Sequence, residues 1–374
     1  MKIVLTHPYC WPYVRRGSER NLDNVARYLV SRGHEVITVS THPEGIKVEE
    51  GGSGKRILHK PWWTPALGLG RISELHTFFF PVLKSLLAME PDAVHSFFYT
   101  DALAAATARR SRNYRTVFQM NGIALPGISC YRFPPEAMIW RQTLKRVDER
   151  VVCTKFIGEL LTRFYGLDYK VVFPPVETDD FPLGAGPADQ RPTIISAADF
   201  NVPRKGVRVL VQAFSIVKEK WPDAVLNLSG RLEDALRDEL LGSLPENVRK
   251  DVHCLGLGKP GDLPAQYREA SVMALAAMWE PSGGAMLEAW SSGAPVVATN
   301  HGGLPEFMTE GVGFLFDPLT EAQESTNAEG LADALIRGLE LSQQPGIRER
   351  CRAHAEQFST RRIGPILESL YAGN

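Results

Sequence analysis

The feature that most constrains the fold of this chain is a regular alternation of short apolar runs with longer amphipathic stretches. Residues 2–6 form a β-branched run, a glycine-containing loop leads into a helical stretch at about 18–31, and residues 35–40 form the next apolar run. A strand, a helix and a second strand in this order make a βαβ unit, whose crossover favours a parallel sheet. The start of the chain therefore predicts a doubly wound α/β fold.

The same alternation continues along the chain and is interrupted once. Further strands are predicted at 56–59, 92–96, 115–119, 150–153 and 170–173, and then at 193–197, 225–229, 252–255, 272–275, 295–299 and 313–316. The interruption, FPLGAGPADQRP at 181–192, is rich in Pro, Gly and Ala and is predicted to be a linker. We therefore expect two α/β domains, an N-terminal one over 1–182 and a C-terminal one over 190–357.

Composition excludes several classes of function. A chain of 374 residues is too long for one ordinary core, and a formal net charge of −1 gives no electrostatic basis for binding nucleic acid. The five cysteines are scattered and never form a CxxC pair, which argues against a disulfide framework or a zinc site. The sequence shows no secretory leader and no apolar run of about 18–20 residues, so we expect a cytoplasmic protein, with nothing that indicates membrane association.

The stretch 279–306, WEPSGGAMLEAWSSGAPVVATNHGGLPE, carries the clearest functional pattern. Ser282 is a predicted helix N-cap, and Gly283 and Gly284 would let a phosphate approach the backbone N–H groups at the positive end of the helix. Glu288 follows one turn later on the same helix face, where its carboxylate could bind a ribose, and Glu280 could reach a group beyond the phosphates. This pattern describes a nucleotide-sugar site. On spacing alone, a common helix start with two solvated glutamates is an equally good interpretation.

Three other segments place polar residues after predicted strands. Lys205, in the sequence PRKG, could neutralise a phosphate or belong to a solvated basic pair. Gly17, beside Arg16 in the first βα loop, could bring backbone N–H groups to a phosphate or form an ordinary turn with Ser18 as the N-cap. Asn121 could bind a sugar hydroxyl, although a plain Asn-Gly turn is the stronger alternative.

Taken together, these segments resemble the retaining glycosyltransferases of family 4, which have the GT-B fold of two Rossmann-like doubly wound domains facing across a cleft. The segment EPSGGAMLE, from Glu280 to Glu288, matches the E-x7-E motif of that family. SSGAPVVAT at 291–299, GGLPE at 302–306, PRKG at 203–206 and the opening GSER…RGHEVITVS support the resemblance, which covers nearly the whole chain.

The resemblance implies roles for particular residues. Glu288 would hold the nucleotide ribose, Glu280 would contact the donor sugar, and the last helix, at 358–374, would pack back on the N-terminal domain. The implied catalytic residues are Glu280, Lys205 and Asn121. The implied nucleotide-binding residues are Arg16, Gly17, Arg204, Ser282, Gly283, Gly284, Leu287 and Glu288.

The sequence departs from the family at three positions. Members often carry a Gly-Arg pair six positions before the lysine, and that arginine binds the diphosphate. This chain has an Ala-Asp pair ending at Asp199, so either the donor site is altered or another cation substitutes, with Arg204 and Arg16 as the candidates. Asn121 stands where members often have a histidine, and Ser282 stands where an aromatic residue often follows Glu-Pro.

We therefore predict a retaining, hexosyltransferase-like enzyme that needs no metal and no cofactor, with a nucleotide-diphosphate sugar as co-substrate. Lys205 and the helix start at 282–284 would stabilise the departing phosphate while an acceptor hydroxyl attacks from the same face. The nucleotide base and the donor sugar stay open, and the acceptor could be a small molecule, a glycan or a lipid-linked compound. Two alternatives remain: a non-catalytic sugar-nucleotide-binding subunit, and a sugar-nucleotide epimerase on the same fold.

Overall fold

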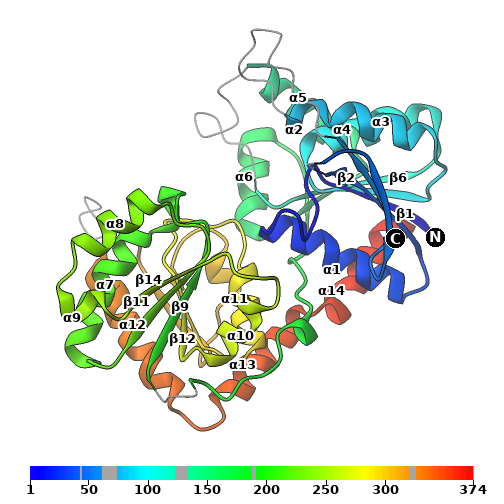
Figure 1. Ribbon diagram of the computed structural model, residues 1–374. Coiled ribbons are helices and arrows are strands. Elements are labelled where there is room, and N and C mark those ends of the chain that lie inside the picture. Colours follow the sequence, from blue (N-terminus) through cyan, green and yellow to red (C-terminus); the bar gives the residue numbers. More distant parts are fainter. Residues whose placement is uncertain (43, 61–73, 123–133, 188–190, 320–325, 374) are drawn as a thin grey trace. The chain divides into compact units, whose positions relative to one another are not determined.

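The computed structural model describes residues 1–42, 44–60, 74–122, 134–187, 191–319 and 326–373. The chain divides into two compact units: unit 1 comprises Met1–Pro175 with Thr360–Asn374, and unit 2 comprises Val176–Ser359 (Figure 1). The division falls before the predicted end of the N-terminal domain at residue 182. Among the helices of the described ranges, none is both long and apolar enough to cross a membrane.

Unit 1 is built on an eight-stranded sheet. The strands, in the order in which they lie side by side, are β3 (Lys47–Gly51), β4 (Gly54–His59), β2 (Glu35–Thr41), β1 (Lys2–Thr6), β5 (Ala93–Ser96), β6 (Arg115–Met120), β7 (Glu149–Val152) and β8 (Lys170–Val171). Neighbouring strands are parallel except β3 and β4, which form an antiparallel hairpin at one edge. The sequence does not predict β3, because KVEEG is mostly exposed, charged and without an apolar run.

Helices cover both faces of this sheet. Strand residues alternate between the faces, so Ile3 and Leu5 contact one layer of helices and Val4 contacts the other. The first layer consists of α1 (Gly17–Ser31) and α14 (Thr360–Ala372). The second layer contains α2 (Glu74–Thr77), α3 (Phe79–Leu87), α4 (Tyr99–Ala108), α5 (Pro134–Arg146) and α6 (Lys155–Tyr165).

Helix α14 completes unit 1 although it comes from the far end of the chain. It lies against α1, and a Cβ atom at Gly364 would be 2.3 Å from the Tyr28 ring, so only glycine fits there (Figure 1). The Tyr28 hydroxyl donates a hydrogen bond to Glu368 at 2.9 Å. The Tyr371 hydroxyl is 2.7 Å from Nδ1 of His95 on the central strand β5.

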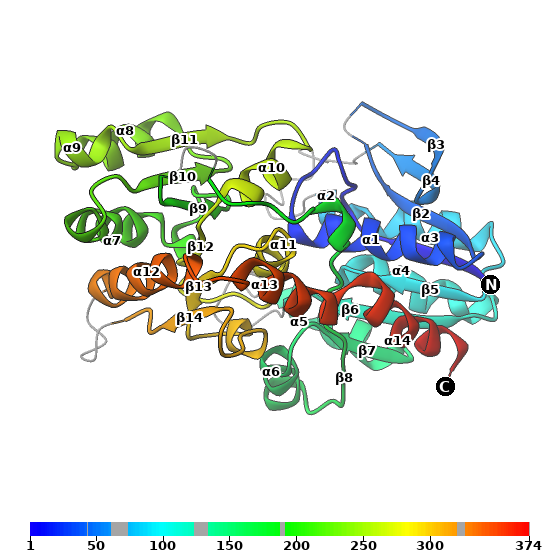
Figure 2. The same cartoon turned by 90° about the horizontal axis from the view of Figure 1, so that it is seen from below.

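Unit 2 contains a six-stranded parallel sheet. Its strands, in spatial order, are β11 (Val252–Gly256), β10 (Val225–Ser229), β9 (Thr193–Ala197), β12 (Val272–Leu275), β13 (Val296–Thr299) and β14 (Gly313–Phe316). On one face α7 (Val207–Lys220) and α12 (Ala328–Ser342) lie side by side over the core (Figure 2). The remaining helices are α8 (Asp234–Gly242), α9 (Glu246–Arg249), α10 (Asp262–Glu269), α11 (Gly284–Ser291) and α13 (Ile347–Ala355).

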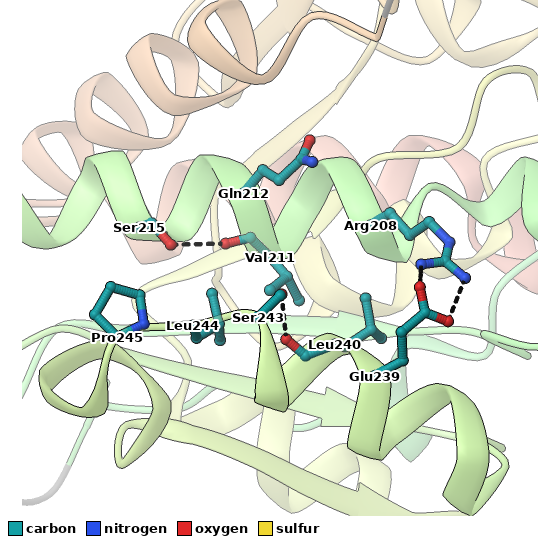
Figure 3. A pocket seen from close by; sticks show the side chains of 9 residues that line it. All are labelled: Arg208, Val211, Gln212, Ser215, Glu239, Leu240, Ser243, Leu244 and Pro245. Carbon is teal, nitrogen blue, oxygen red and sulfur yellow. Dashed lines mark hydrogen bonds and ion pairs between the residues drawn. The ribbon is translucent and has the colours of Figure 1, made fainter.

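A groove with a volume of about 460 Å³ lies between α7 and α8 (Figure 3). Its lining residues are Arg208, Val211, Gln212, Ser215, Glu239, Leu240, Ser243, Leu244 and Pro245. The Arg208 guanidinium and the Glu239 carboxylate form a two-bonded ion pair across it, and Ser215 and Ser243 donate to carbonyls of their own helices. The charged and hydroxyl groups of the lining are thus paired, and the lining includes none of the predicted site residues.

Candidate nucleotide-binding site

The predicted site residues of unit 2 lie on two loops at one edge of the sheet and on the helix α11, and a third loop lies beside them. The loops at 198–206, 276–283 and 300–303 follow β9, β12 and β13, which are neighbours in the sheet. Because these strands are parallel, their carboxyl ends meet at the same edge, which is where doubly wound sheets bind ligands. The fold thus brings the sequence segments PRKG, EPSGG and HGG together.

Glu280 has a fixed backbone. It forms an isolated parallel bridge with Gly302, and its carbonyl accepts a hydrogen bond from Gly303 N at 2.8 Å. Gly302 has a φ of 72°, and a Cβ atom there would lie 2.4 Å from the Glu280 carbonyl oxygen. Glycine is therefore required by both the backbone angle and the close approach, so the glycine pair after β13 positions Glu280.

Two cations converge on the Glu280 carboxylate. Lys205 Nζ donates to Glu280 Oε1, and Arg204 Nη1 is 3.0 Å from the same oxygen. The Glu280 side chain is 9% exposed and that of Lys205 is 20% exposed, so this ion pair is shielded from water. The Arg204 guanidinium also stacks over Trp279 at 5.3 Å and donates to the Trp279 carbonyl at 3.1 Å. Sequence reasoning gave Trp279 no role.

A tight turn presents these cations. Pro203–Lys205 form one 3-10 turn, Gly206 follows with a φ of 72°, and α7 begins at Val207. A Cβ atom at Gly206 would be 1.9 Å from the Ala276 carbonyl oxygen, so this position also requires glycine. Met278 N donates to the Arg204 carbonyl at 2.7 Å, which ties the turn to the loop after β12.

The start of α11 differs from the sequence prediction. The N-cap is Gly283, and no side chain caps the helix, so the prediction of Ser282 as N-cap is wrong. Gly283 packs so closely that a Cβ atom would be 3.0 Å from the Phe307 ring. This packing places the glycine, rather than the serine, at the helix start. Among the described residues, no side chain caps the N–H groups of the first turn.

Leu287 and Glu288 lie side by side in α11 but in different surroundings. The Leu287 side chain is 1% exposed and belongs to the core. Glu288 is half-buried and lies one turn after Gly284. Of the two side chains, only that of Glu288 is in a position to reach a ligand at the helix start.

The carboxyl end of α11 is anchored by two arginines of α13 that sequence reasoning missed. Arg348 donates to the Ser292 carbonyl at 2.8 Å and Arg352 to the Ser291 carbonyl at 3.1 Å. Arg348 also bonds the Gly184, Arg268 and Ala270 carbonyls, and Arg352 bonds the Thr178 and Phe181 carbonyls. Their four-residue spacing predicts a shared helix face, but their carbonyl partners come from distant segments that no local pattern reveals.

Asp199, the acidic departure from the family pattern, follows β9 and has its own partners. Its carboxylate accepts from Asn201 N at 3.3 Å and lies 3.9 Å from Nη1 of Arg231, in the loop after β10. Gly230 makes this approach possible, since a Cβ atom there would be 1.8 Å from the Ala198 carbonyl oxygen. Sequence reasoning did not single out Arg231.

The predicted residues of unit 1 lie at the start of α1 and on the loop after β6. Arg16 occupies the N-cap position of α1, so α1 starts before Ser18, the N-cap of the alternative interpretation. Arg16 stacks over Tyr9 at 4.8 Å, and a Cβ atom at Gly17 would meet open space. Asn121 comes directly after β6, and its Nδ2 is buried without a hydrogen-bond partner within the described part of the chain.

The histidines near the strand ends of unit 1 are buried. His7 follows β1, and burial lowers its pKa. His95 is fully buried within β5, and burial lowers its pKa to about 3. Both imidazoles are therefore neutral near pH 7, and His95 serves as a contact between the sheet and α14.

Two doubly wound α/β units, one of them with a cation–carboxylate cluster beside an uncapped helix start, define a protein of the GT-B class. The sequence matches two family descriptions, "Glycosyltransferase Family 4" over residues 15–180 and "Glycosyl transferases group 1" over residues 191–340. The chain belongs to this family of glycosyltransferases.

Individual relatives resemble parts or all of the chain. It is 36% identical over 122 residues to mannosylfructose-phosphate synthase of Agrobacterium fabrum, a match that covers 30% of this chain and 27% of that protein. It is 29% identical over 258 residues to D-inositol 3-phosphate glycosyltransferase of Corynebacterium kroppenstedtii, covering 62% of this chain and 54% of that protein. The chain thus spans about a quarter to a half of the length of these two relatives.

A solved structure supports the fold over the full length. HepE of Anabaena, determined in complex with UDP-glucose, superimposes with a TM-score of 0.76 at 18% sequence identity, covering 100% of both chains. The predicted architecture of two Rossmann-like domains is confirmed.

Proposed function

We propose that this protein transfers a sugar, with retention of anomeric configuration, from a nucleotide-diphosphate sugar to an acceptor hydroxyl. The observation that carries the proposal is the pair of cations, Arg204 and Lys205, bonded to Glu280 on the loop that leads into α11. A cation pair and free helix N–H groups are the groups that stabilise a departing diphosphate. The family match and the HepE–UDP-glucose complex favour the same ligand class.

In unit 2 we assign the diphosphate to Arg204, Lys205, Gly283 and Gly284, and the ribose to the half-buried Glu288. A carboxylate can accept hydrogen bonds from both hydroxyls of a ribose. We also assign Ser282, on the loop before α11, and Leu287, a core residue of α11, to the nucleotide-binding site.

We also assign Glu280 to the donor sugar, and we assign Arg16, Gly17 and Asn121 of unit 1 to substrate binding. The buried Asn121 Nδ2 supports its assignment, because it has no acceptor among the described residues and a buried amide N–H without an acceptor costs free energy unless a ligand or water accepts from it. Acid–base chemistry needs no further group in this scheme, because the departing phosphate can take the proton of the attacking hydroxyl.

The first test is ligand binding. UDP, GDP and ADP and their sugar conjugates are titrated into the purified protein by calorimetry, and UDP-sugars are the first candidates because HepE binds UDP-glucose. One diphosphate should bind and should raise the melting temperature, since a ligand at 100 times its Kd adds about 2.7 kcal/mol of stability. A folded protein that binds none of these nucleotides would contradict the proposal.

The second test separates the roles of two residues. Glu288→Ala should raise the nucleotide Kd at least about tenfold, because it removes the ribose contact, a charge-assisted hydrogen bond. Lys205→Ala should lower kcat about a hundredfold, because it removes stabilisation of the leaving group. Glu310→Gln, an exposed carboxylate on the loop after β13, is the matched control and should leave both quantities unchanged. Wild-type kinetics in both test variants would remove this site assignment.

A second candidate function rests on Asp199. A carboxylate at the end of β9 repels phosphate, and this favours a subunit that binds sugar nucleotides without turning them over. Such a protein would show nucleotide binding in calorimetry but neither transfer nor hydrolysis of any sugar conjugate. An epimerase would convert the bound nucleotide sugar in the absence of an acceptor.

A further inference from the structure

The cation cluster of unit 2 contains an internal anion. Arg204 Nη1 and Lys205 Nζ both contact the same oxygen, Oε1, of Glu280. Two positive charges therefore meet one negative charge, so the three side chains together carry one uncompensated positive charge. The cluster is thus both paired and still attractive to a further anion.

The backbone of Glu280 is fixed, whereas its carboxylate can change partners by rotation about the side-chain torsions alone. The bridge to Gly302 and the bond from Gly303 N secure the Glu280 main chain, and Met278 N secures the turn that carries both cations. Only the side-chain torsions of Glu280 are needed to take its carboxylate off Lys205. Such rotations cost far less than a backbone movement.

A diphosphate is the stronger partner for these cations. It carries two or three negative charges and several acceptor oxygens, whereas Glu280 offers one charge and shares a single oxygen between two cations. When a diphosphate takes Lys205 and Arg204, the Glu280 carboxylate loses its partners. It then becomes an acceptor for hydroxyl groups adjacent to the diphosphate, such as those of the transferred sugar.

We propose that Glu280 is a resident counterion of the donor site, which occupies Lys205 and Arg204 when no donor is bound and which the donor diphosphate displaces. This inference rests on the function proposed above and adds a step to it: an exchange of ion pairs that precedes sugar binding. Before the exchange, Glu280 keeps the two cations close together in a partly water-excluded place. The free-energy cost of their mutual repulsion is therefore met during folding and not during donor binding. After it, the same carboxylate faces the sugar.

The exchange makes an unusual prediction: removal of a predicted substrate-binding residue should strengthen the binding of the diphosphate part of the ligand. Glu280→Gln keeps the size of the side chain and removes its charge. Inorganic pyrophosphate and the nucleoside diphosphate should bind this variant about three- to tenfold more tightly than the wild type, since the competing anion is gone. Turnover of the sugar conjugate should fall, since the amide cannot replace the carboxylate at the sugar.

Calorimetric titration at a fixed low salt concentration measures both affinities, and circular dichroism melting checks that each variant is folded. Glu310→Gln removes one exposed negative charge from the same unit without touching either cation, and it should bind like the wild type. Glu280→Asp, which retracts the carboxylate by one methylene, should give affinities between those of the wild type and Glu280→Gln.

The outcomes separate the two proposals. Unchanged or weaker pyrophosphate binding in folded Glu280→Gln, compared with the wild type, overturns the counterion exchange even if the nucleotide binds. A wild-type protein that binds pyrophosphate but no nucleoside diphosphate overturns the proposed function and leaves the exchange to be judged by the pyrophosphate result. An equal gain in affinity in Glu310→Gln would show a general charge effect and would also overturn the exchange.

Discussion

Gly302 shows how one residue can determine the position of a functional carboxylate. Its φ of 72° lies in the left-handed region, and a Cβ atom would lie only 2.4 Å from the Glu280 carbonyl oxygen. Gly302→Ala should therefore lower the free energy of unfolding by about 2–4 kcal/mol and should lower turnover of the sugar conjugate, because the bridge to Glu280, the residue assigned to the donor sugar, must shift. Urea denaturation and steady-state kinetics measure the two effects.

Gly346→Ala is the matched control for this change. Gly346 has nearly the same φ, 74°, but a Cβ atom there would meet open space, so alanine bears only the cost of the backbone angle, about 1 kcal/mol. A similar loss of stability in the two variants would contradict the claim that contact with Glu280 determines the residue at 302.

At the scale of the element, α11 depends on contacts at both of its ends. Arg348 donates to four carbonyl groups, one of which belongs to Ser292 at the end of α11. Arg348→Met keeps most of the apolar stem and leaves these carbonyls without their donor, so it should lower the free energy of unfolding by about 3 kcal/mol. Arg348→Lys should restore only part of this, because an ammonium group cannot match the planar fork of donors.

The neighbouring Arg350 provides the comparison for Arg348. It is exposed and makes one long bond, 3.4 Å, to the Gly311 carbonyl, so Arg350→Met should change the stability by less than about 0.5 kcal/mol. Thermal and urea melts of the three variants test this order. Equal stabilities for the Arg348 and Arg350 variants would mean that α13 does not anchor α11.

The helices and strands also show which features of the fold and of the site can be predicted from the sequence alone. Periodicity predicts the parallel strands because each is a buried apolar run, but not β3, whose residues are exposed and charged. Spacing predicts Glu280, Lys205 and Glu288 as polar residues after strands or on a helix start. It does not predict the bond between Glu280 and Lys205, because 75 residues separate them and only the sheet order makes β9 and β12 neighbours. The sequence misplaces the N-cap of α11 at Ser282, because packing against Phe307, and not a capping side chain, puts Gly283 at that position.

At the scale of the whole molecule, a buried histidine connects the central sheet of unit 1 to the C-terminal helix. His95 on β5 contacts the Tyr371 hydroxyl on α14, and burial lowers the pKa of His95 to about 3. The unfolded chain protonates this imidazole near its ordinary pKa of about 6.5, so the unfolded state binds more protons between these values. The contribution of His95 to the free energy of unfolding is therefore fully present above pH 6.5 and is lost as the pH falls toward 3.

The measurement is the dependence of the melting temperature on pH between 7 and 4. His95→Gln removes the titrating group and should flatten this dependence relative to the wild type, even if its melting temperature at pH 7 is lower. A mutant curve parallel to that of the wild type would show that His95 does not contribute to the acid sensitivity.

Unit 1 is built from two segments that are far apart in the sequence, and this affects how the chain folds during synthesis. Its sheet is made early by the ribosome, but α14, which covers part of one face, is made only after the whole of unit 2. At roughly 5–20 residues per second, synthesis of the intervening segment takes on the order of ten seconds or more. During that time the apolar side chains beneath α14 are open to water and to other polypeptides, so we expect unit 2 to finish folding first and chaperones to meet this protein at the uncovered face of unit 1.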